Sequence, residues 1–246
     1  MSTRKNCHPS QLEITRRAAV GVALCAVGSV LSPKILYASE DVNNTDGVVV
    51  PLLTLNVHLP YMESGVFAQR ELLDNGSRVR VLIIDAASGC EIECLEEAIS
   101  SPLKGARLLR DGSLRPAASS NYNTELSRTV TLAKPNGVSV RSQVWTEVNV
   151  TAGQSWGQIE RVNACGQRPG SGNYQLEATH TYSSTTTFPT NTVVIGYSGN
   201  VLITNSNSLG ISYSGVLNSG FTLSGSATAT WYARKSYNSK VSISLR

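Results

Sequence analysis

The chain has 246 residues, of which 41% are hydrophobic, 15% are charged and 6% are aromatic. This apolar fraction is enough to build a core and excludes wholesale disorder, while the surface is more neutral than that of an average domain, where about a quarter of the residues are charged. After residue 40 no apolar run approaches the roughly 20 residues that cross a bilayer, so no membrane span is predicted there.

Residues 1–38 have the composition of an export signal peptide. A basic leader is followed by an apolar run of small residues, Ala18 to Leu31, and cleavage is predicted between Ala38 and Ser39. The Thr15-Arg16-Arg17 sequence before this run resembles a twin-arginine (Tat) export signal, and the resemblance covers this segment only. It implies an exported protein, in the periplasm or outside the cell. General secretion and a retained anchor are the alternatives.

Removal of the signal changes the charge of the chain. The signal contains five basic residues and one acidic residue, namely Arg4, Lys5, Arg16, Arg17, Lys34 and Glu13. The mature chain therefore has 21 − 5 = 16 basic and 17 − 1 = 16 acidic residues, and a net charge of zero. A nucleic-acid-binding domain carries a basic stripe. The mature chain has no net positive charge, so we expect no nucleic-acid partner.

Residues 39–47 are polar and predict a linker, and residues 48–115 predict a small mixed α/β portion. Val48 to Leu59 is apolar and β-branched but contains Pro51, which is typical of an edge strand. Ser77 to Asp85 alternates arginines with aliphatic residues and predicts a strand with one exposed face.

The mixed portion also contains the segment with the strongest helical spacing. Ile92, Leu95 and Ile99 fall on one side of a helix over 91–99, which Pro102 would end. On that helix the four glutamates of the segment form a solvated face, so a paired-carboxylate glycosidase site is not predicted.

Three cysteines remain after cleavage, so at most one internal disulfide forms. The favoured bridge joins Cys165 to Cys90 or Cys94, because closing this long loop is worth about 4 kcal/mol against about 2 kcal/mol for the short Cys90–Cys94 ring. The metal alternative is a zinc site of Cys90, Cys94, Cys165 and His180, but its spacing lies outside common patterns. We therefore predict no metal. Phosphate loops, haem-attachment motifs and dinucleotide fingerprints are absent from the sequence, so no cofactor is predicted either.

Residues 116–246 predict an antiparallel β-sheet domain. Ser127 to Ala133 and Val138 to Val150 flank Lys134-Pro135-Asn136-Gly137, whose residues favour a hairpin turn. In the second strand the valines share the even positions, which places Trp145 on the opposite, polar face.

Period-two alternation is clearest from residue 193 to the end. The apolar residues are odd-numbered: Val193, Ile195, Tyr197, Val201, Ile203, Leu209, Ile211, Tyr213, Phe221, Leu223, Ala227, Ala229, Trp231, Val241, Ile243 and Leu245. Serines and threonines occupy the even positions between them, which indicates a meander of antiparallel strands with one core face. The fold class is therefore mainly β, an antiparallel sandwich or meander with a small mixed α/β N-terminal portion.

One string has the pattern of a catalytic nucleophile, because Gly153 to Gly157 matches G-x-S-x-G around Ser155. His180 and Glu177 are the partners available downstream for a serine hydrolase. No Asp follows Ser155, and the residues after Gly157 start a helix poorly, so the segment is interpreted as a turn and the hydrolase as the alternative function.

The binding hypothesis uses the outward aromatic Trp145 and the nearby Trp156, with Arg141 and Glu147 as polar neighbours. Their natural ligand is a glycan or another surface ligand. Low-charge strands with small side chains also have edges that pair readily with other chains, which favours self-association. The sequence thus predicts an exported, non-catalytic protein that acts by binding or surface assembly. An exposed aromatic groove would favour binding, and an unpaired apolar edge strand would favour assembly.

Overall fold

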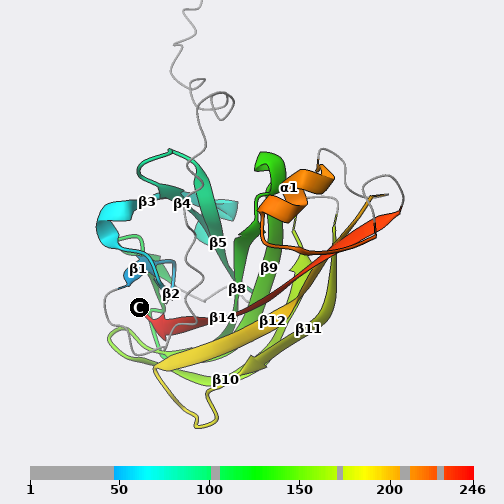
Figure 1. Cartoon of the computed structure of the whole chain (residues 1–246). Coiled ribbons are helices and arrows are strands. Elements are labelled where there is room, and N and C mark those ends of the chain that lie inside the picture. Colours follow the sequence, from blue (N-terminus) through cyan, green and yellow to red (C-terminus); the bar gives the residue numbers. More distant parts are fainter. Residues whose placement is uncertain (1–46, 101–105, 171–173, 206–210, 226–229) are drawn as a thin grey trace, which may run out of the picture. The chain divides into compact units, whose positions relative to one another are not determined.

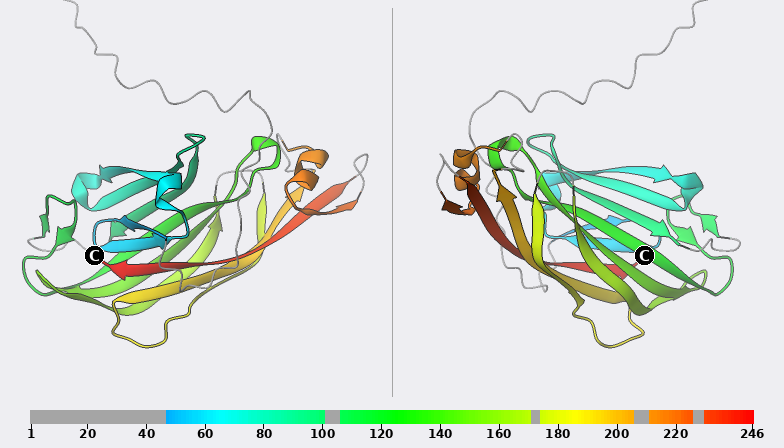
Figure 2. Two further views of the ribbon diagram at one scale, coloured as in Figure 1. Left: turned by 60° about the vertical axis from the view of Figure 1, so that its left-hand side comes forward. Right: turned by 90° about the vertical axis from the view of Figure 1, so that its right-hand side faces the viewer.

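Two antiparallel sheets and one short helix make up the described part of the chain. A computed structural model describes residues 47–100, 106–170, 174–205, 211–225 and 230–246, all of which fall in the unit 37–246. The predicted signal peptide and residues 39–46 of the predicted linker lie outside the described residues. Figures 1 and 2 show the sheets as two facing layers, one containing β8 and β9 and the other containing β12 and β14.

The first sheet has the strand order β1-β2-β14-β12-β11, and the short strand β13 also pairs with β14. Its strands are β1 (Val48–Pro51), β2 (Leu55–Leu59), β11 (Gln175–Ser183), β12 (Thr192–Thr204), β13 (Thr222–Gly225) and β14 (Trp231–Leu245). All these pairings are antiparallel.

The second sheet has the order β10-β9-β8-β5-β4-β3 and is antiparallel throughout. Its strands are β3 (Val66–Leu73), β4 (Arg78–Asp85), β5 (Glu91–Ile99), β8 (Ser120–Ala133), β9 (Val140–Ala152) and β10 (Gly157–Pro169). A separate two-stranded sheet joins β6 (Arg107–Leu108) and β7 (Leu114–Arg115). Single 3-10 turns cover Glu63–Gly65, Asp74–Gly76 and Pro135–Gly137.

The core lies between the sheets and follows the predicted alternation. On β12 and β14 the buried apolar residues are the odd-numbered Val193, Ile195, Tyr197, Val201, Ile203, Trp231, Ala233, Val241 and Ile243. On β9 the even-numbered valines from Val140 to Val150 are buried as well. The predicted mainly β, antiparallel sandwich architecture is confirmed. Leu209, Ala227 and Ala229 lie outside the described residues.

The hairpin predicted around Lys134 to Gly137 is confirmed, because it joins β8 to β9 with Asn136 at φ 50° and Gly137 at φ 79°. The continuous meander is wrong at one place, where Tyr213–Asn218 form the helix α1. The Ser212 hydroxyl accepts a hydrogen bond from the Gly215 amide at 3.1 Å and caps this helix. Asn136 donates to the same Ser212 oxygen at 2.7 Å, so α1 is docked on the hairpin.

The predicted helix over residues 91–99 is wrong, because this segment is strand β5. It pairs with β4 on one side and with β8 on the other, so both its backbone edges are satisfied. Helix propensity differs among ordinary residues by less than about 0.7 kcal/mol per residue, and tertiary pairing outweighs it here. The glutamates are consequently not one solvated face: Glu93 and Glu97 are buried and Glu96 faces outward.

The boundary predicted at residues 115/116 falls inside one unit. Strand β5 pairs with β8 along Glu93 to Ile99, so the first part of the chain shares a sheet with the later strands. The main buried cluster likewise combines residues from both sides of that boundary, such as Val79 and Val148. The described residues of 48–115 form strands and single 3-10 turns.

No helix among the described residues is long and apolar enough to cross a bilayer.

Candidate functional site

The outer edge of β3 is the candidate functional site. β3 is the last strand of the second sheet and pairs only with β4 in the described structure. The strand begins after the Glu63–Gly65 turn and ends at Leu73, where Asp74, Asn75 and Gly76 all have positive φ values, of 50°, 56° and 87°. Left-handed residues cannot continue a strand, so the chain reverses there into β4.

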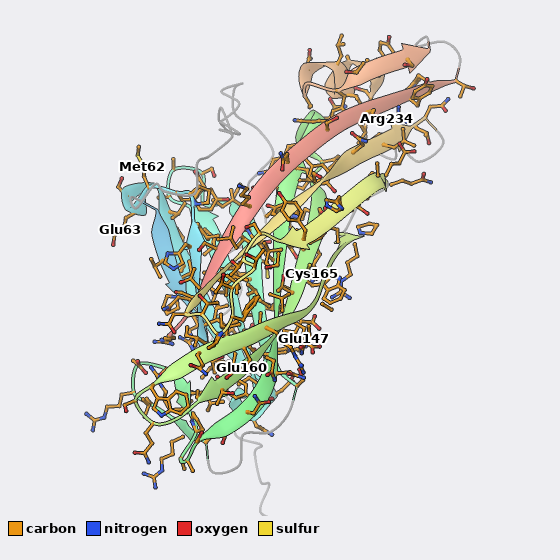
Figure 3. All side chains as sticks on the ribbon, turned by 90° about the horizontal axis from the view of Figure 1, so that it is seen from below. Met62, Glu63, Glu147, Glu160, Cys165 and Arg234 are labelled. Atoms are coloured by element: carbon orange, nitrogen blue, oxygen red, sulfur yellow. The ribbon has the colours of Figure 1, made fainter. Side chains whose placement is uncertain are left out.

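Large apolar side chains are exposed along this edge. Phe67 is 51% exposed and Leu72 is 43% exposed, and Met62, in the loop before β3, is 79% exposed. Met62 and Glu63 project from the loop between β2 and β3, on the side of the unit away from Glu147 (Figure 3). Soluble proteins usually blunt such edges with proline, charged side chains or a bulge. β3 contains no proline and no bulge, and its charged residues are Arg70 and Glu71.

The charges of β3 leave its edge accessible. The Arg70 guanidinium donates to the carbonyl oxygens of Gly112 at 2.6 Å and of Leu52 at 3.1 Å, so it is held back against the unit. A carboxylate oxygen of Glu71 lies 3.9 Å from a guanidinium nitrogen of Arg80 on the neighbouring strand β4. Neither charge therefore covers the outward backbone groups of the strand.

The other sheet edges are short or closed. β1 has four residues and ends at Pro51, so the edge-strand prediction for Val48 to Leu59 holds only for this first part. Leu55–Leu59 form β2, an inner strand between β1 and β14. The edges at β10 and β11 lie against each other: Gln167 donates from β10 to the carbonyl oxygens of His180 at 3.0 Å and Ser198 at 2.9 Å. A further bridge joins Ile159 to Thr190.

One inner stretch of β14 also has an open side in the described structure. β13 pairs with β14 as far as Arg234, and β2 pairs with it from Ser242 onward. Ser236 to Val241, between these partners, pairs with β12 only. This opening is closed at both ends by β13 and β2, whereas no strand of the described residues pairs with any part of the outer edge of β3.

The candidate residues of the alternative serine hydrolase are not brought together. Ser155 is exposed in the turn between β9 and β10, where the Gly153 amide donates to the Trp156 carbonyl at 2.9 Å. His180 lies at the opposite end of β10, near Gln167. Because a strand rises about 3.3 Å per residue, about ten residues of β10 separate them by about 30 Å. The interpretation of this segment as a turn is correct.

Glu177 and His180 have structural partners instead. Glu177 forms an ion pair with Arg234, with 2.9 Å between the closest oxygen and nitrogen. His180 stacks on Tyr182 with 5.2 Å between ring centroids. A bulge at Ala178 (φ 48°) separates the two residues in the register of β11.

Trp145 lies on the outer face of β9, as predicted, and belongs to neither buried cluster. Its indole lies against Gly166 of β10, where an added Cβ would meet Nε1 at 2.9 Å. The Arg168 guanidinium lies 6.0 Å from the ring centroid. The predicted cover was a loop, the charged N-terminal portion or a ligand; the observed contacts come from the neighbouring strand of the same sheet.

The polar neighbours of Trp145 are also engaged within the protein. Arg141 pairs with Glu91 at 2.9 Å, and Glu147 accepts from Asn163 at 2.7 Å. Trp156 is in the β9–β10 turn, about 23 Å along β9 from Trp145 at 3.3 Å per residue. Its ring packs on Gly153, so the two tryptophans do not form one platform.

Replacing Trp145 with alanine should lower the free energy of unfolding by about 1–2 kcal/mol, because a half-buried indole and its contact with a guanidinium are lost. Gln143→Ala, two residues earlier on the same face, is the control and should cost about 0.5 kcal/mol or less. Urea denaturation measures both. An unchanged stability of the tryptophan variant would contradict the packing role and return Trp145 to the ligand hypothesis.

The predicted disulfide is absent from the described residues. Cys94 lies on the outer face of β5, while Cys165 on β10 points inward and packs on the core (Figure 3). Three strand spacings of about 4.8 Å separate these strands, whereas disulfides need Cα atoms within about 7 Å. Cys90 lies in the β4–β5 turn, where its carbonyl accepts from the Asp85 amide at 2.9 Å. It is therefore as far from Cys165 in the strand order as Cys94 is. Burial raises the pKa of Cys94 to about 11, so its thiol stays protonated near neutral pH.

The same strand order separates the four residues of the zinc alternative. Among the described residues, no group of three or more His, Cys, Asp or Glu side chains has the geometry to hold a metal ion.

Buried charges join the two sheets, and two of them, Glu93 and Glu97, belong to the glutamates that the sequence interpretation placed in solvent. The Arg128 guanidinium contacts both carboxylate oxygens of Glu93, at 2.5 and 3.0 Å, and donates to the Tyr197 hydroxyl at 3.1 Å. The Tyr61 hydroxyl donates to Glu93 at 2.6 Å. Glu97 accepts from the Leu53 amide at 2.6 Å. A strand alternation of Glu93, Leu95 and Glu97 was the signal for these inward positions.

A small hollow lies beside the C-terminal residue Arg246, with Tyr122 and Leu114 in its wall. Its volume is about 10 Å³, roughly what one water molecule needs. This space is too small for an organic substrate.

Comparison of the chain with protein-family models, with curated proteins and with solved structures finds no match.

Proposed function

We propose that this chain is an exported, non-catalytic β-sandwich protein that acts by assembly through the open edge of its second sheet. The observation that carries the proposal is β3, an eight-residue edge strand with exposed apolar side chains. Such a strand adds to another sheet through its main-chain groups, while the side chains beside it supply apolar contact.

The arrangement of the other candidate residues supports assembly over the alternatives. A serine hydrolase needs Ser155 within hydrogen-bond reach of His180, and β10 separates them. A glycan platform needs exposed aromatic rings with available polar groups, and Arg141 and Glu147 are engaged by Glu91 and Asn163. β3 has an outward edge to which no described strand is paired.

The edge is tested by the double substitution Phe67→Lys and Leu72→Lys. Because both side chains are exposed, the fold should be retained, while two lysines on the edge oppose strand addition. Sedimentation velocity over a range of concentrations should show association of the unsubstituted chain and only monomer for the double variant. Leu217→Lys on α1, where the leucine is 56% exposed, is the matched control and should associate normally. An unsubstituted chain that stays monomeric up to its solubility limit would refute the proposal.

Export is part of the same proposal and depends on the arginine pair. Replacing Arg16 and Arg17 with lysine should leave the precursor in the cytoplasm, because the twin-arginine route requires that pair. Arg4→Lys keeps the same charge outside the pair and should export normally. Cell fractionation measures the outcome, and sequencing of the exported chain should give Ser39 as its first residue. Normal export of the double variant would indicate the general secretory route.

A further inference from the structure

The hydrogen bonds between β3 and β4 determine which residues of β3 direct their backbone amides and carbonyls outward. The Gly65 carbonyl accepts from the Ala86 amide at 3.0 Å, and this contact continues the β3–β4 register, in which Val66 faces Asp85. In an antiparallel pair, hydrogen-bonded and non-hydrogen-bonded residues alternate. The odd-numbered residues of β3 therefore bond to β4, and the even-numbered residues, from Val66 to Leu72, direct their amides and carbonyls outward.

We propose that the partner of this edge is a second copy of the chain, whose β3 pairs antiparallel with the first around a two-fold axis at Gln69. The inference rests on the proposed function and specifies its partner and register. Two-fold pairing of identical edges is closed, so it gives a dimer with one continuous sheet rather than an open filament.

The faces of the sheet limit the register. Leu72, Arg70 and Ala68 lie opposite Val79, Val81 and Ile83, whose side chains point into the core, so the even-numbered side chains of β3 share the inner face. Residues directly opposite each other across two strands lie on the same face. Even residues must therefore face even residues of the second copy, which also brings outward amides opposite outward carbonyls.

The charges of β3 exclude two of the remaining registers, and the pairing of its apolar residues favours one of the others. An axis at Arg70 places two guanidinium groups opposite each other, and an axis at Glu71 opposes two carboxylates; directly opposed like charges are unfavourable. An axis at Gln69 opposes two neutral amides, and pairs Val66 with Leu72 of the second copy. An axis at Ala68 leaves Leu72 beyond the paired residues.

The local contacts of the strand are compatible with this register. Arg70 faces Ala68 of the second copy, and its guanidinium is already held by the Gly112 and Leu52 carbonyls. Phe67 faces Glu71 of the second copy, where the ring can pack on the aliphatic stem of the glutamate. The proposed dimer therefore forms without a change in the protonation of any side chain and without a bound ligand.

Cysteine cross-linking tests the axis directly. In the proposed dimer the two Gln69 residues form a non-hydrogen-bonded pair with Cα atoms about 4.5 Å apart, which lies within the range for a disulfide. Gln69→Cys in the full chain should therefore give mostly cross-linked dimer under mild oxidation. Phe67→Cys is the matched control on the same face: its two copies lie about 13 Å apart at 3.3 Å per residue and should not cross-link. A mixture of Phe67→Cys and Glu71→Cys chains should cross-link with each other.

The unsubstituted chain contains the native cysteines, so its cross-linking under the same oxidation gives the background level. If sedimentation shows association but Phe67→Cys or Arg70→Cys cross-links better than Gln69→Cys, the register is wrong while assembly through the edge stands. If neither association nor cross-linking occurs, the proposed function fails together with the dimer.

Discussion

Replacing Glu97 with alanine should lower the free energy of unfolding by about 4 kcal/mol. The carboxylate is fully buried and accepts hydrogen bonds from the Leu53 amide at 2.6 Å, the Thr54 amide at 3.1 Å and the Thr124 hydroxyl at 3.0 Å. Alanine leaves buried amides without an acceptor, at about 1–3 kcal/mol each, and opens a cavity as well. Burial raises the pKa of Glu97, while the hydrogen bonds from Thr54 and Leu53 act in the opposite direction.

Glu96→Ala is the matched control for Glu97, because it is the adjacent residue on the opposite face of β5. Glu96 pairs with Arg80 at 2.6 Å in a partly exposed ion pair, which is worth less than about 1 kcal/mol. Urea denaturation of both variants measures the difference. Equal losses would mean that β5 does not present alternate residues to the core, and would reopen the helical interpretation of this segment.

Trp231→Ala should cost about 3–5 kcal/mol, the range for emptying a large aromatic site in a core. Trp231 is buried in the second core cluster at the start of β14, and its ring meets that of Tyr213 edge-on with 6.0 Å between centroids. The substitution therefore removes packing between β14 and α1 as well as burial within the sheet.

Thr230→Ala, one residue earlier, changes an exposed side chain and should cost about 0.5 kcal/mol or less. Thermal unfolding of the two variants compares neighbouring positions of one segment. A loss for Thr230→Ala as large as that for Trp231→Ala would contradict the inward assignment of the odd-numbered residues.

The local sequence pattern was sufficient to predict which side chains face the core in strands with one buried and one solvent-exposed face. The valines of β9 and the odd-numbered residues of β12 and β14 face the core as predicted, because a strand alternates its side chains with a period of two. The turn at Asn136-Gly137 was also predictable, since both residues accept positive φ values.

Tertiary pairing decided the elements whose local signals were ambiguous. Ile92, Leu95 and Ile99 have helical spacing, yet β4 and β8 pair with the segment and turn Glu93 and Glu97 inward. Ile211, Tyr213 and Phe221 belong to the odd-numbered apolar series, yet the Ser212 cap and its contact with Asn136 favour a helix turn over residues 213–218. Distant segments supplied the hydrogen bonds of β5, and for α1 the distant Asn136 adds to the local Ser212 cap.

The sequence by itself determined the fold class, the facing of the long strands and the expectation of an export signal. Strand order, which comes only from long-range pairing, decided the rest. It placed Cys94 and Cys165 three strands apart, set Ser155 and His180 at opposite ends of β10, and left β3 at the end of its sheet. An edge is a property of what does not pair with a strand, so the composition of residues 66–73 alone could not reveal it.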